Sequence, residues 1–399
     1  MIEQSDQVVH LCIDEEKLLH VLQDLIRIQS VNPDLDPKGS GESEIAYYIA
    51  KKLTDLGLVM KYQMITETRF NVIGIMTGTG KGKTLMLNGH MDTVGIQGYI
   101  EPLEPVYSDG NVYGRGSFDM KCGLATMIMI AETIVKSGIQ LEGDLMLAFV
   151  VDEEYKSIGT EGLVKEFTAD AAILCEPTNM EVIVTHKGFA WEQIEIHGKA
   201  AHGSLPNEGI DAILKAGKVL YEIEKLSRQL TTKSHPLLGS PSIHASLISG
   251  GTELSTYPNY CKIELERRTI PGEAYTDIVS EMQGLLQRFA DEDEQFKADL
   301  TVLFSREPFE VSQDEEIVQL LQQSYATCLQ QEGKISGFGG WGDSGLLQEA
   351  GIPTVIFGPS GEGAHAVNEH VCFTSLVQTT TIILNTVVQY CVLAESQNQ

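Results

Sequence analysis

Short apolar runs alternate with helical segments over residues 71–174 of this chain of 399 residues. The runs predict strands at Asn71–Met76, Thr84–Leu87, Asp144–Val151 and Ala171–Leu174, with helices around Gly123–Ser137 and Gly159–Phe167 between them. Strands and helices that alternate through short links favour an α/β layer with a largely parallel sheet. In such a sheet, ligands gather at the carboxyl ends of the strands, so polar residues at those ends are the first candidates for a function.

Two imidazoles and three carboxylates follow apolar runs of this kind. They are His90, Asp119, Glu154, Glu176 and, less tightly, His365. Imidazole together with carboxylate suits zinc and its neighbours among the divalent metals. A pair of such ions can activate water and hold a carbonyl oxygen. We therefore expect these five residues to form a ligand set for two divalent cations.

The spacing of the first motifs suggests further roles. His90 and Asp92 are two residues apart in NGHMDTV, so an extended segment points both side chains the same way. A carboxylate beside a metal-binding histidine can accept its other N–H. Asp119 in GRGSFDMKCG has two oxygens and can bridge two cations, which an imidazole cannot. Taken alone, each segment also fits a surface loop or a glycine-rich turn.

Three acids stand directly after an apolar strand in VVDEE. Such a cluster is unfavourable unless positive charge lies nearby, although a solvated acidic turn is the alternative. Because adjacent residues diverge in direction, Glu153 and Glu154 cannot easily share one task, so one can be a ligand while the other reaches a water. In GEGAHAVNEH, His365 is the candidate ligand, and Glu369 and His370 are interpreted as decoys rather than ligands.

The pattern changes after His186. Alternating apolar and polar residues in WEQIEIHG, PSIHASLISGG and NYCKIELERRTI, with helices at Ile210–Leu226 and Ala274–Phe289, fit a smaller α+β domain with a half-exposed antiparallel sheet. The α/β character returns after Pro308. We therefore expect one domain formed by residues 1–186 and 306–399, with a second domain, residues 187–305, inserted into it.

Charge and cysteine usage limit the partners and the compartment. The net charge of −28 argues against nucleic acid, which requires Lys and Arg to neutralise phosphates. The seven cysteines are odd in number and contain no CxxC pair, which favours a reducing cytoplasm. No apolar run approaches the roughly 20 residues of a membrane span, and the N-terminus does not read as a secretory signal. We expect a cytoplasmic protein that binds neither nucleic acid nor membrane.

Eight motifs follow one another along the chain, namely NGHMDTV, GRGSFDMKCG, VVDEE, CEPT, GKAAHGS, RRTIPGE, GGWGDSG and AHAVNEH. In residues and order they resemble those of the zinc aminoacylase/carboxypeptidase family, which includes acetylornithine deacetylase, succinyl-diaminopimelate desuccinylase, glutamate carboxypeptidase and aminoacylase-1. The resemblance spans almost the whole chain, from about SVNP to the last helix. It implies a zinc-exopeptidase-like catalytic domain with a mostly parallel sheet, and an inserted lid that usually forms a homodimer. It also implies two bound Zn²⁺ ions, with Co²⁺ or Mn²⁺ as alternatives.

The resemblance also assigns roles to individual residues. His90 and Glu176 would hold one ion, His365 and Glu154 the other, and Asp119 both. Asp92 would orient His90, and Glu153 would be the general base. This division agrees with the expectation that only one of the two adjacent glutamates is a ligand.

In the lid, the resemblance points to the substrate. His202 of AAHGS would contact a substrate carbonyl or carboxylate, often across the dimer, and Arg268 of ERRTIPGE would bind a substrate carboxylate. Arg267 is interpreted as the surface neighbour of Arg268. The chain departs from the family pattern at Ser255, where several members have Asn, and at Gly342, where Thr or Ser is usual. Both departures lie in segments that shape the substrate pocket.

The sequence therefore predicts a metal-dependent hydrolase of linear amides. The expected reaction removes an N-acyl group from a small substrate that bears a carboxylate, with acetylornithine as the first specific candidate. A dipeptidase or carboxypeptidase of the same family is the alternative. A binding protein that keeps the fold without catalysis is the alternative from another class.

Overall fold

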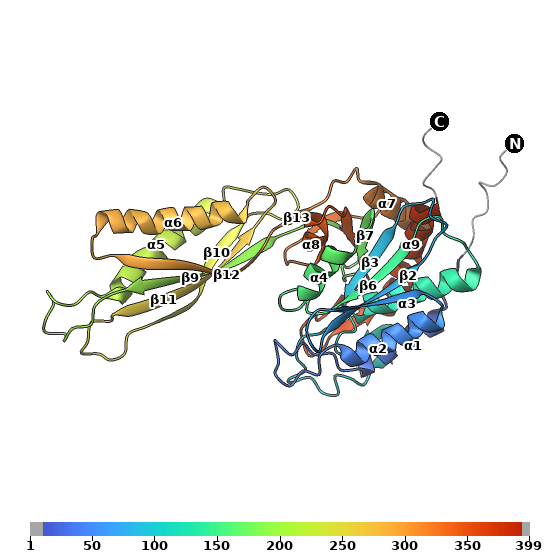
Figure 1. Cartoon of the computed structure of the whole chain (residues 1–399), viewed down its shortest axis with the longest axis horizontal. Coiled ribbons are helices and arrows are strands. Elements are labelled where there is room, and N and C mark those ends of the chain that lie inside the picture. The colour runs from blue at the N-terminus through green and yellow to red at the C-terminus, as the bar shows by residue number, and fades with distance from the viewer. Residues whose placement is uncertain (1–10, 393–399) are drawn as a thin grey trace. The chain divides into compact units, whose positions relative to one another are not determined.

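The computed structural model describes residues 11–392, which form two compact units (Figure 1). The first unit contains residues 11–184, 311–336 and 346–392, and the second contains residues 185–310 and 337–345. The second unit is thus inserted into the chain of the first. The sequence predicts domain boundaries at 186/187 and 305/306, and these boundaries remain a prediction.

The largest sheet within residues 11–392 has nine strands, in the order β1-β2-β6-β3-β7-β15-β8-β13, with β14 also paired to β8. Strands β6, β3, β7 and β15 are parallel neighbours, whereas β1 and β2 on one side and β8 and β13 on the other pair antiparallel. The predicted α/β fold class is confirmed. The bounds are β1 Val59–Met64, β2 Phe70–Met76, β3 Leu85–His90, β6 Leu145–Val150, β7 Ala171–Leu174, β8 Val182–His186, β13 Phe309–Glu310, β14 Ile335–Phe338 and β15 Thr354–Ile356.

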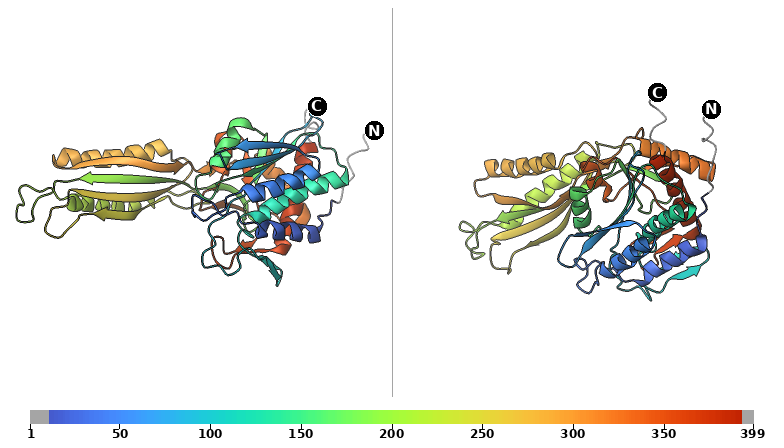
Figure 2. Two further views of the ribbon diagram at one scale, coloured as in Figure 1. Left: turned by 60° about the horizontal axis from the view of Figure 1, so that its bottom comes forward. Right: turned by 45° about the vertical axis from the view of Figure 1, so that its right-hand side comes forward.

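Helices cover both faces of this sheet. On one face, α3 is buried along most of its length and packs with α9 against β3, while α1 lies beside α3 (Figure 2). On the other face, Leu163 of α4 and Leu347 of α8 join an apolar cluster with Met86, Ala148 and Ala172 of the strands. The helices are α1 Glu15–Arg27, α2 Ser43–Asp55, α3 Lys121–Ser137, α4 Ile158–Glu166, α7 Glu316–Leu329, α8 Ser344–Glu349 and α9 Phe373–Val392.

A small sheet joins two segments that are far apart in the sequence. Its order is β16-β17-β5-β4, and all of its pairings are antiparallel. The strands are β4 Val106–Ser108, β5 Asn111–Tyr113, β16 Gly361–Glu362 and β17 His370–Cys372. Runs of two or three residues are too short to show a periodicity, which is why the sequence did not predict this sheet.

The second unit has its own core. A four-stranded antiparallel sheet, in the order β10-β11-β9-β12, packs one face against α5 and α6 (Figure 1). Buried and partly exposed residues alternate along β9 and β11, as expected for a sheet with one covered face. The elements are β9 Gly188–His197, α5 Ala212–Leu230, β10 Ser242–Gly250, β11 Tyr260–Thr269, α6 Tyr275–Glu292 and β12 Lys297–Arg306. Within residues 11–392, no helix combines the length and hydropathy needed to cross a membrane.

Candidate metal centre

Three adjacent parallel strands deliver part of the predicted site to one edge of the large sheet. His90 is the last residue of β3, which lies between β6 and β7. Strand β6 ends at Val150, shortly before Glu153 and Glu154, and β7 ends two residues before Glu176. Because these strands are parallel, their carboxyl ends meet at the same edge, as predicted for a ligand site.

Asp119 and His365 are carried by loops outside the large sheet. Asp119 lies in the loop between β5 and α3, and His365 lies between β16 and β17. The expectation that Asp119 directly, and His365 less tightly, follow strands of the parallel sheet is therefore wrong, because the small sheet carries these loops. His365 has a φ of 64°, a left-handed conformation that is uncommon outside glycine and is often found at functional sites.

Two groups of three side chains share Asp119. Nε2 of His90 lies 3.2 Å from Oδ1 of Asp119 and 3.4 Å from Oε1 of Glu176. Nε2 of His365 lies 3.3 Å from Oδ2 of Asp119 and 3.0 Å from Oε2 of Glu154. In each group, the possible ligand atoms all lie within 4.8 Å of one another. Asp119 thus offers one oxygen to each group, as a carboxylate that bridges two cations would.

The electrostatics of the cluster fit bound cations. Burial acts to lower the pKa of His90, but Glu176 and Asp119 outweigh it and raise this pKa well above its usual value. Hydrogen bonds with Asp119 and then with Glu154 raise the pKa of His365 to about 10. Without an ion, the carboxylates therefore draw protons onto both imidazoles. A divalent cation would supply that positive charge and leave the ring nitrogens free as ligands.

The buried carboxylate of Glu154 gives a second test of whether the residues suit a bound cation. Only 5% of its side chain is exposed, and Oε1 has no hydrogen-bond partner among the described residues. Burial, followed by the charge of Asp119, raises the pKa of Glu154. A buried carboxylate oxygen is costly unless it is paired or coordinates a metal. Imidazole nitrogens and carboxylate oxygens in this number suit zinc or a similar divalent metal, so the residues fit such ions.

Asp92 contacts both His90 and the acidic loop. Nδ1 of His90 lies 2.9 Å from the backbone oxygen of Asp92 and 3.5 Å from its Oδ1. Since a carbonyl oxygen can only accept, Nδ1 carries the proton in the neutral ring and the lone pair of Nε2 points into the cluster. The Asp92 carboxylate also accepts the backbone N–H groups of Glu153 and Glu154, both at 3.2 Å. Oε2 of Glu153 lies 3.8 Å from Nε2 of His90.

Asn32 is a member of the site that the sequence analysis missed. Its Nδ2 donates to Oδ2 of Asp92 at 2.8 Å and to Oδ1 of Asp152 at 3.0 Å. Arg69 also reaches Asp152, with Nη1 2.9 Å from Oδ1, and pairs with buried Glu42. No local pattern in the segment SVNP signals contacts with residues 60 and 120 positions away.

The two substrate-binding candidates lie in the second unit. His202 is exposed, and its Nδ1 accepts the N–H of Ser204 at 3.2 Å, so the neutral ring carries its proton on Nε2. Arg268 pairs with Glu266 at 2.7 Å and lies over the ring of Phe189.

The prediction that Arg267 is a surface residue is wrong. Only 1% of its side chain is exposed, and it pairs with Glu273 at 2.9 Å. Successive side chains of a strand point to opposite faces, and Arg267 takes the covered face of β11 while Arg268 takes the open one.

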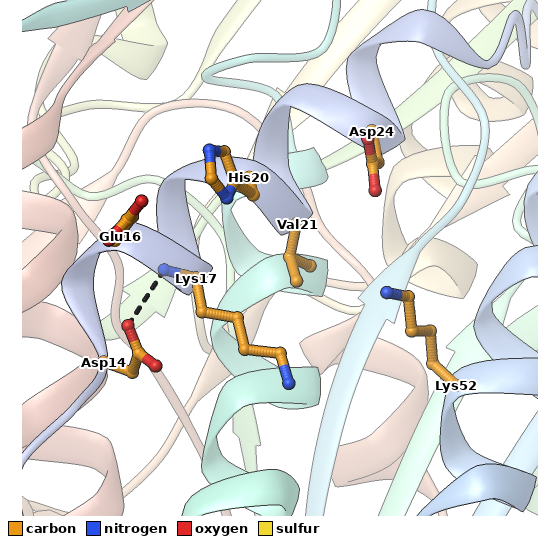
Figure 3. A pocket seen from close by; sticks show the side chains of 7 residues that line it. All are labelled: Asp14, Glu16, Lys17, His20, Val21, Asp24 and Lys52. Carbon is orange, nitrogen blue, oxygen red and sulfur yellow. Dashed lines mark hydrogen bonds between the residues drawn. The ribbon is translucent and has the colours of Figure 1, made fainter.

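A surface hollow of about 330 Å³ lies elsewhere on the first unit, on α1 and α2 (Figure 3). It is lined by Asp14, Glu16, Lys17, His20, Val21, Asp24 and Lys52, none of which belongs to the metal cluster. Two of its charged groups have partners: the Asp14 carboxylate accepts the backbone N–H of Lys17 at 3.1 Å (Figure 3), and the Lys17 ammonium pairs with Glu132.

Comparison with known proteins agrees with this geometry. Residues 86–389 match Peptidase family M20/M25/M40. The chain is 28% identical to an N-formyl-4-amino-5-aminomethyl-2-methylpyrimidine deformylase of Halalkalibacterium halodurans, with 98% of both chains covered. It is 26% identical to an acetylornithine deacetylase of Myxococcus xanthus, over 81% of this chain and 84% of that protein.

A crystal structure of a tripeptidase from Staphylococcus aureus is similar along nearly the whole chain. The TM-score is 0.79 at 25% identity, and the match covers 95% of this chain and 99% of the other. The resemblance to the zinc aminoacylase/carboxypeptidase family is thereby confirmed. The chain belongs to Peptidase family M20/M25/M40 and is a metal-dependent hydrolase that acts on amide bonds.

Proposed function

We propose that this protein is a two-metal amidohydrolase that removes an N-acyl group from a small amino acid, with acetylornithine as the first substrate to test. One observation carries the proposal: Asp119 turns one oxygen toward His90 and Glu176 and the other toward His365 and Glu154. Similarity to two relatives named as a deformylase and a deacetylase supports deacylation. Zn²⁺ is the proposed metal, with Co²⁺ or Mn²⁺ as alternatives.

His90 and Glu176 would hold one ion, His365 and Glu154 the other, and Asp119 both. Such a pair of cations, when bound, polarises a carbonyl oxygen and lowers the pKa of water. The Nδ1 contacts of His90 with Asp92 keep its Nε2 directed at the first group. Asp92 would thus act as a positioning residue for both His90 and the loop of Glu153 and Glu154.

Glu153 would be the general base. Its carboxylate would accept a proton from the attacking water as the new C–O bond forms at the amide carbon. It would then give that proton to the leaving nitrogen as the C–N bond breaks. The backbone N–H groups of Glu153 and Glu154 donate to the two oxygens of Asp92, which holds the backbone of both residues in place.

His202 and Arg268 would recognise the substrate. The Nε2–H of His202 would donate to the amide oxygen as negative charge develops on it. Arg268 would bind a substrate carboxylate through two parallel hydrogen bonds, with its guanidinium already ordered by Glu266 and Phe189. We further propose a homodimer formed through the second unit, a cytoplasmic location, and no role for nucleic acid or membrane.

The variant Glu153→Gln tests the general base. Glutamine keeps the shape of the side chain but cannot take up the proton, so kcat on the best substrate should fall about 10²–10⁴-fold. Metal content, measured by atomic emission, should stay at two ions per chain. The exposed Glu166 of α4 provides a matched control, because Glu166→Gln should change neither quantity. Wild-type turnover in Glu153→Gln would refute the assignment.

The substrate class needs a separate assay. Similarity to the tripeptidase structure favours peptide cleavage as a second candidate function. The metal-loaded protein should be tested on acetylornithine, succinyl-diaminopimelate, an N-formyl amine, dipeptides and tripeptides. Cleavage of peptides alone would replace deacylation by peptidase activity. Protein purified without chelator that carries no metal and cleaves none of these compounds would favour the non-catalytic binding protein.

A further inference from the structure

Glu369 lies four residues after His365 and is fully buried, with 0% of its surface exposed. Its two carboxylate oxygens accept four hydrogen bonds from one short loop. Oε2 accepts from Nη1 of Arg115 at 2.6 Å and from the backbone N–H of Gly116 at 3.0 Å. Oε1 accepts the backbone N–H groups of Phe118 and Asp119, both at 3.0 Å. Glu369 therefore binds the loop that presents Asp119, including the amide of Asp119 itself.

The loop is shaped to surround this carboxylate. Gly116 has a φ of 79°, and a Cβ atom there would lie 2.8 Å from Cδ of Lys121. Only glycine adopts this conformation readily and leaves room for the lysine. Three backbone N–H groups between Gly116 and Asp119 can thus converge on Glu369. Charged acceptors make stronger hydrogen bonds to backbone N–H groups than neutral ones do.

The same contacts extend to His365. Nη2 of Arg115 donates to the backbone oxygen of His365 at 3.4 Å, and Nε of Arg115 donates to the oxygen of Gly95 at 3.2 Å. The backbone N–H of Gly114 donates to the oxygen of Glu369 at 3.3 Å. The loop of Asp119 and the segment of His365 are therefore tied together by buried contacts that involve neither ligand side chain.

We infer that Glu369 is a positioning residue for the metal centre, which sets the place of Asp119 between His90 and His365. The inference rests on the proposed two-metal function and adds to it a residue that touches no substrate and no ligand side chain. Rotation of the Asp119 backbone would move Oδ1 and Oδ2 together, so both groups would lose their shared ligand at once. Glu369 was set aside as a metal ligand, and it belongs to neither group of candidate ligands; its contacts support a role behind Asp119.

The variant Glu369→Gln tests the inference. Glutamine has nearly the same volume, but one acceptor oxygen is replaced by an NH₂ group, which would face two of the four donors. Metal-free protein should be titrated with Zn²⁺ in a calorimeter and with Co²⁺ in a visible spectrometer. Changes in residues that support ligands typically cost 10–100-fold in metal affinity, so we expect a loss of that size and an altered Co²⁺ absorption spectrum.

A matched control separates positioning from general stability. The carboxylate of Asp144 accepts the backbone N–H of Gly78 at 2.8 Å, next to the start of β6 and away from the ligand ends of the strands. Asp144→Asn should leave zinc affinity and the cobalt spectrum unchanged. If Glu369→Gln does not fold, Arg115→Lys is the second variant. Lysine keeps the positive charge but lacks the several N–H donors of the guanidinium, so metal affinity should also fall.

The outcomes for the two proposals can be told apart. Wild-type protein that binds fewer than two ions per chain contradicts the two-metal function. Wild-type protein that binds two ions, together with a folded Glu369→Gln variant of unchanged affinity and cobalt spectrum, overturns only the role of Glu369. The role of Glu369 is also overturned if Glu369→Gln and Asp144→Asn bind metal equally weakly. The loss of metal affinity would then come from lower stability of the fold.

Discussion

At the scale of single residues, hydrogen bonds hold the side chains of the site in one orientation. His90 has its Nδ1 proton engaged by Asp92, so only Nε2 is left for a metal. The carboxylate of Asp92 is in turn surrounded by donors, namely Asn32 and two backbone N–H groups. Supporting groups of this kind fix the orientation of a ligand before a metal binds.

Asn32 gives a prediction at this scale. Asn32→Leu keeps the volume but removes the donor between two buried carboxylates, Asp92 and Asp152. We expect the free energy of unfolding to fall by about 1–3 kcal/mol, because buried acceptors lose a partner. Zinc affinity should fall about 10–100-fold, since Asp92 loses one of the donors that fix its position. Urea unfolding and calorimetric zinc titration measure the two effects.

Asn71 is the matched control for this prediction. It is also fully buried, and its Nδ2 also donates twice, to Gln63 at 2.9 Å and to the Gly159 oxygen at 2.8 Å. Asn71→Leu should destabilise the fold by a similar amount and leave zinc affinity close to wild type. Equal losses of affinity in both variants would show that Asn32 acts only through stability.

At the scale of elements, the candidate metal centre lies where strand ends, the start of α3 and the β16–β17 segment converge. Parallel neighbours β6, β3 and β7 supply ligand candidates from adjacent ends. Helix α3 must approach β7 closely, since a Cβ atom on Gly123 would lie 2.2 Å from the carbonyl oxygen of Cys175. Asp119 precedes this helix and Glu176 follows that carbonyl, so their proximity depends on the close approach.

The variant Gly123→Ala should therefore push α3 away from the end of β7 and leave every candidate metal ligand in the sequence. The added methyl group must displace backbone, which typically costs 1–3 kcal/mol in a packed core. We expect thermal stability, zinc affinity and turnover all to decrease. Gly217 in α5 is the control, because a Cβ there meets no atom within 4 Å. Gly217→Ala should raise stability by up to about 1 kcal/mol through helix propensity. A Gly123→Ala protein with wild-type zinc affinity would contradict the close-approach argument.

At the scale of the whole molecule, the described chain consists of two units with separate cores, and the metal-ligand candidates all belong to the first. Both tryptophans of the chain, Trp191 and Trp341, belong to the second unit. Tryptophan fluorescence therefore reports on the second unit, whereas far-ultraviolet circular dichroism reports on both. A ligand stabilises only the structure that binds it.

Removal of metal by a chelator should accordingly destabilise the first unit more than the second. Excess Zn²⁺ at 100 times its dissociation constant stabilises its binding unit by about 2.7 kcal/mol for each ion bound, and chelation withdraws this contribution. We expect EDTA to lower the midpoint of the transition seen by circular dichroism and to leave the midpoint seen by tryptophan fluorescence nearly unchanged. Equal shifts in both signals would mean that the units unfold together or that the second unit binds the metal.

Much of this protein follows from local patterns in its sequence. Apolar runs and alternating patterns predicted the α/β class and the positions of several helices and strands to within a few residues, because burial imposes a period of two on half-exposed strands and 3.6 on helices. Strand β7 has the predicted bounds, Ala171–Leu174. The five ligand candidates were also found from the sequence, since ligand chemistry restricts residue type and the parallel sheet restricts the position of His90, Glu154 and Glu176.

Only the tertiary structure decided how those candidates meet. The sharing of Asp119 between two histidines depends on the small sheet of β4, β5, β16 and β17, whose strands are too short to leave a periodic signal. The supporting contacts of Asn32 and Glu369 join segments 60 to 254 residues apart, and a hydrogen bond between such segments imposes no spacing on the sequence. Residue type and short-range spacing therefore determined the chemistry, whereas long-range packing determined its geometry.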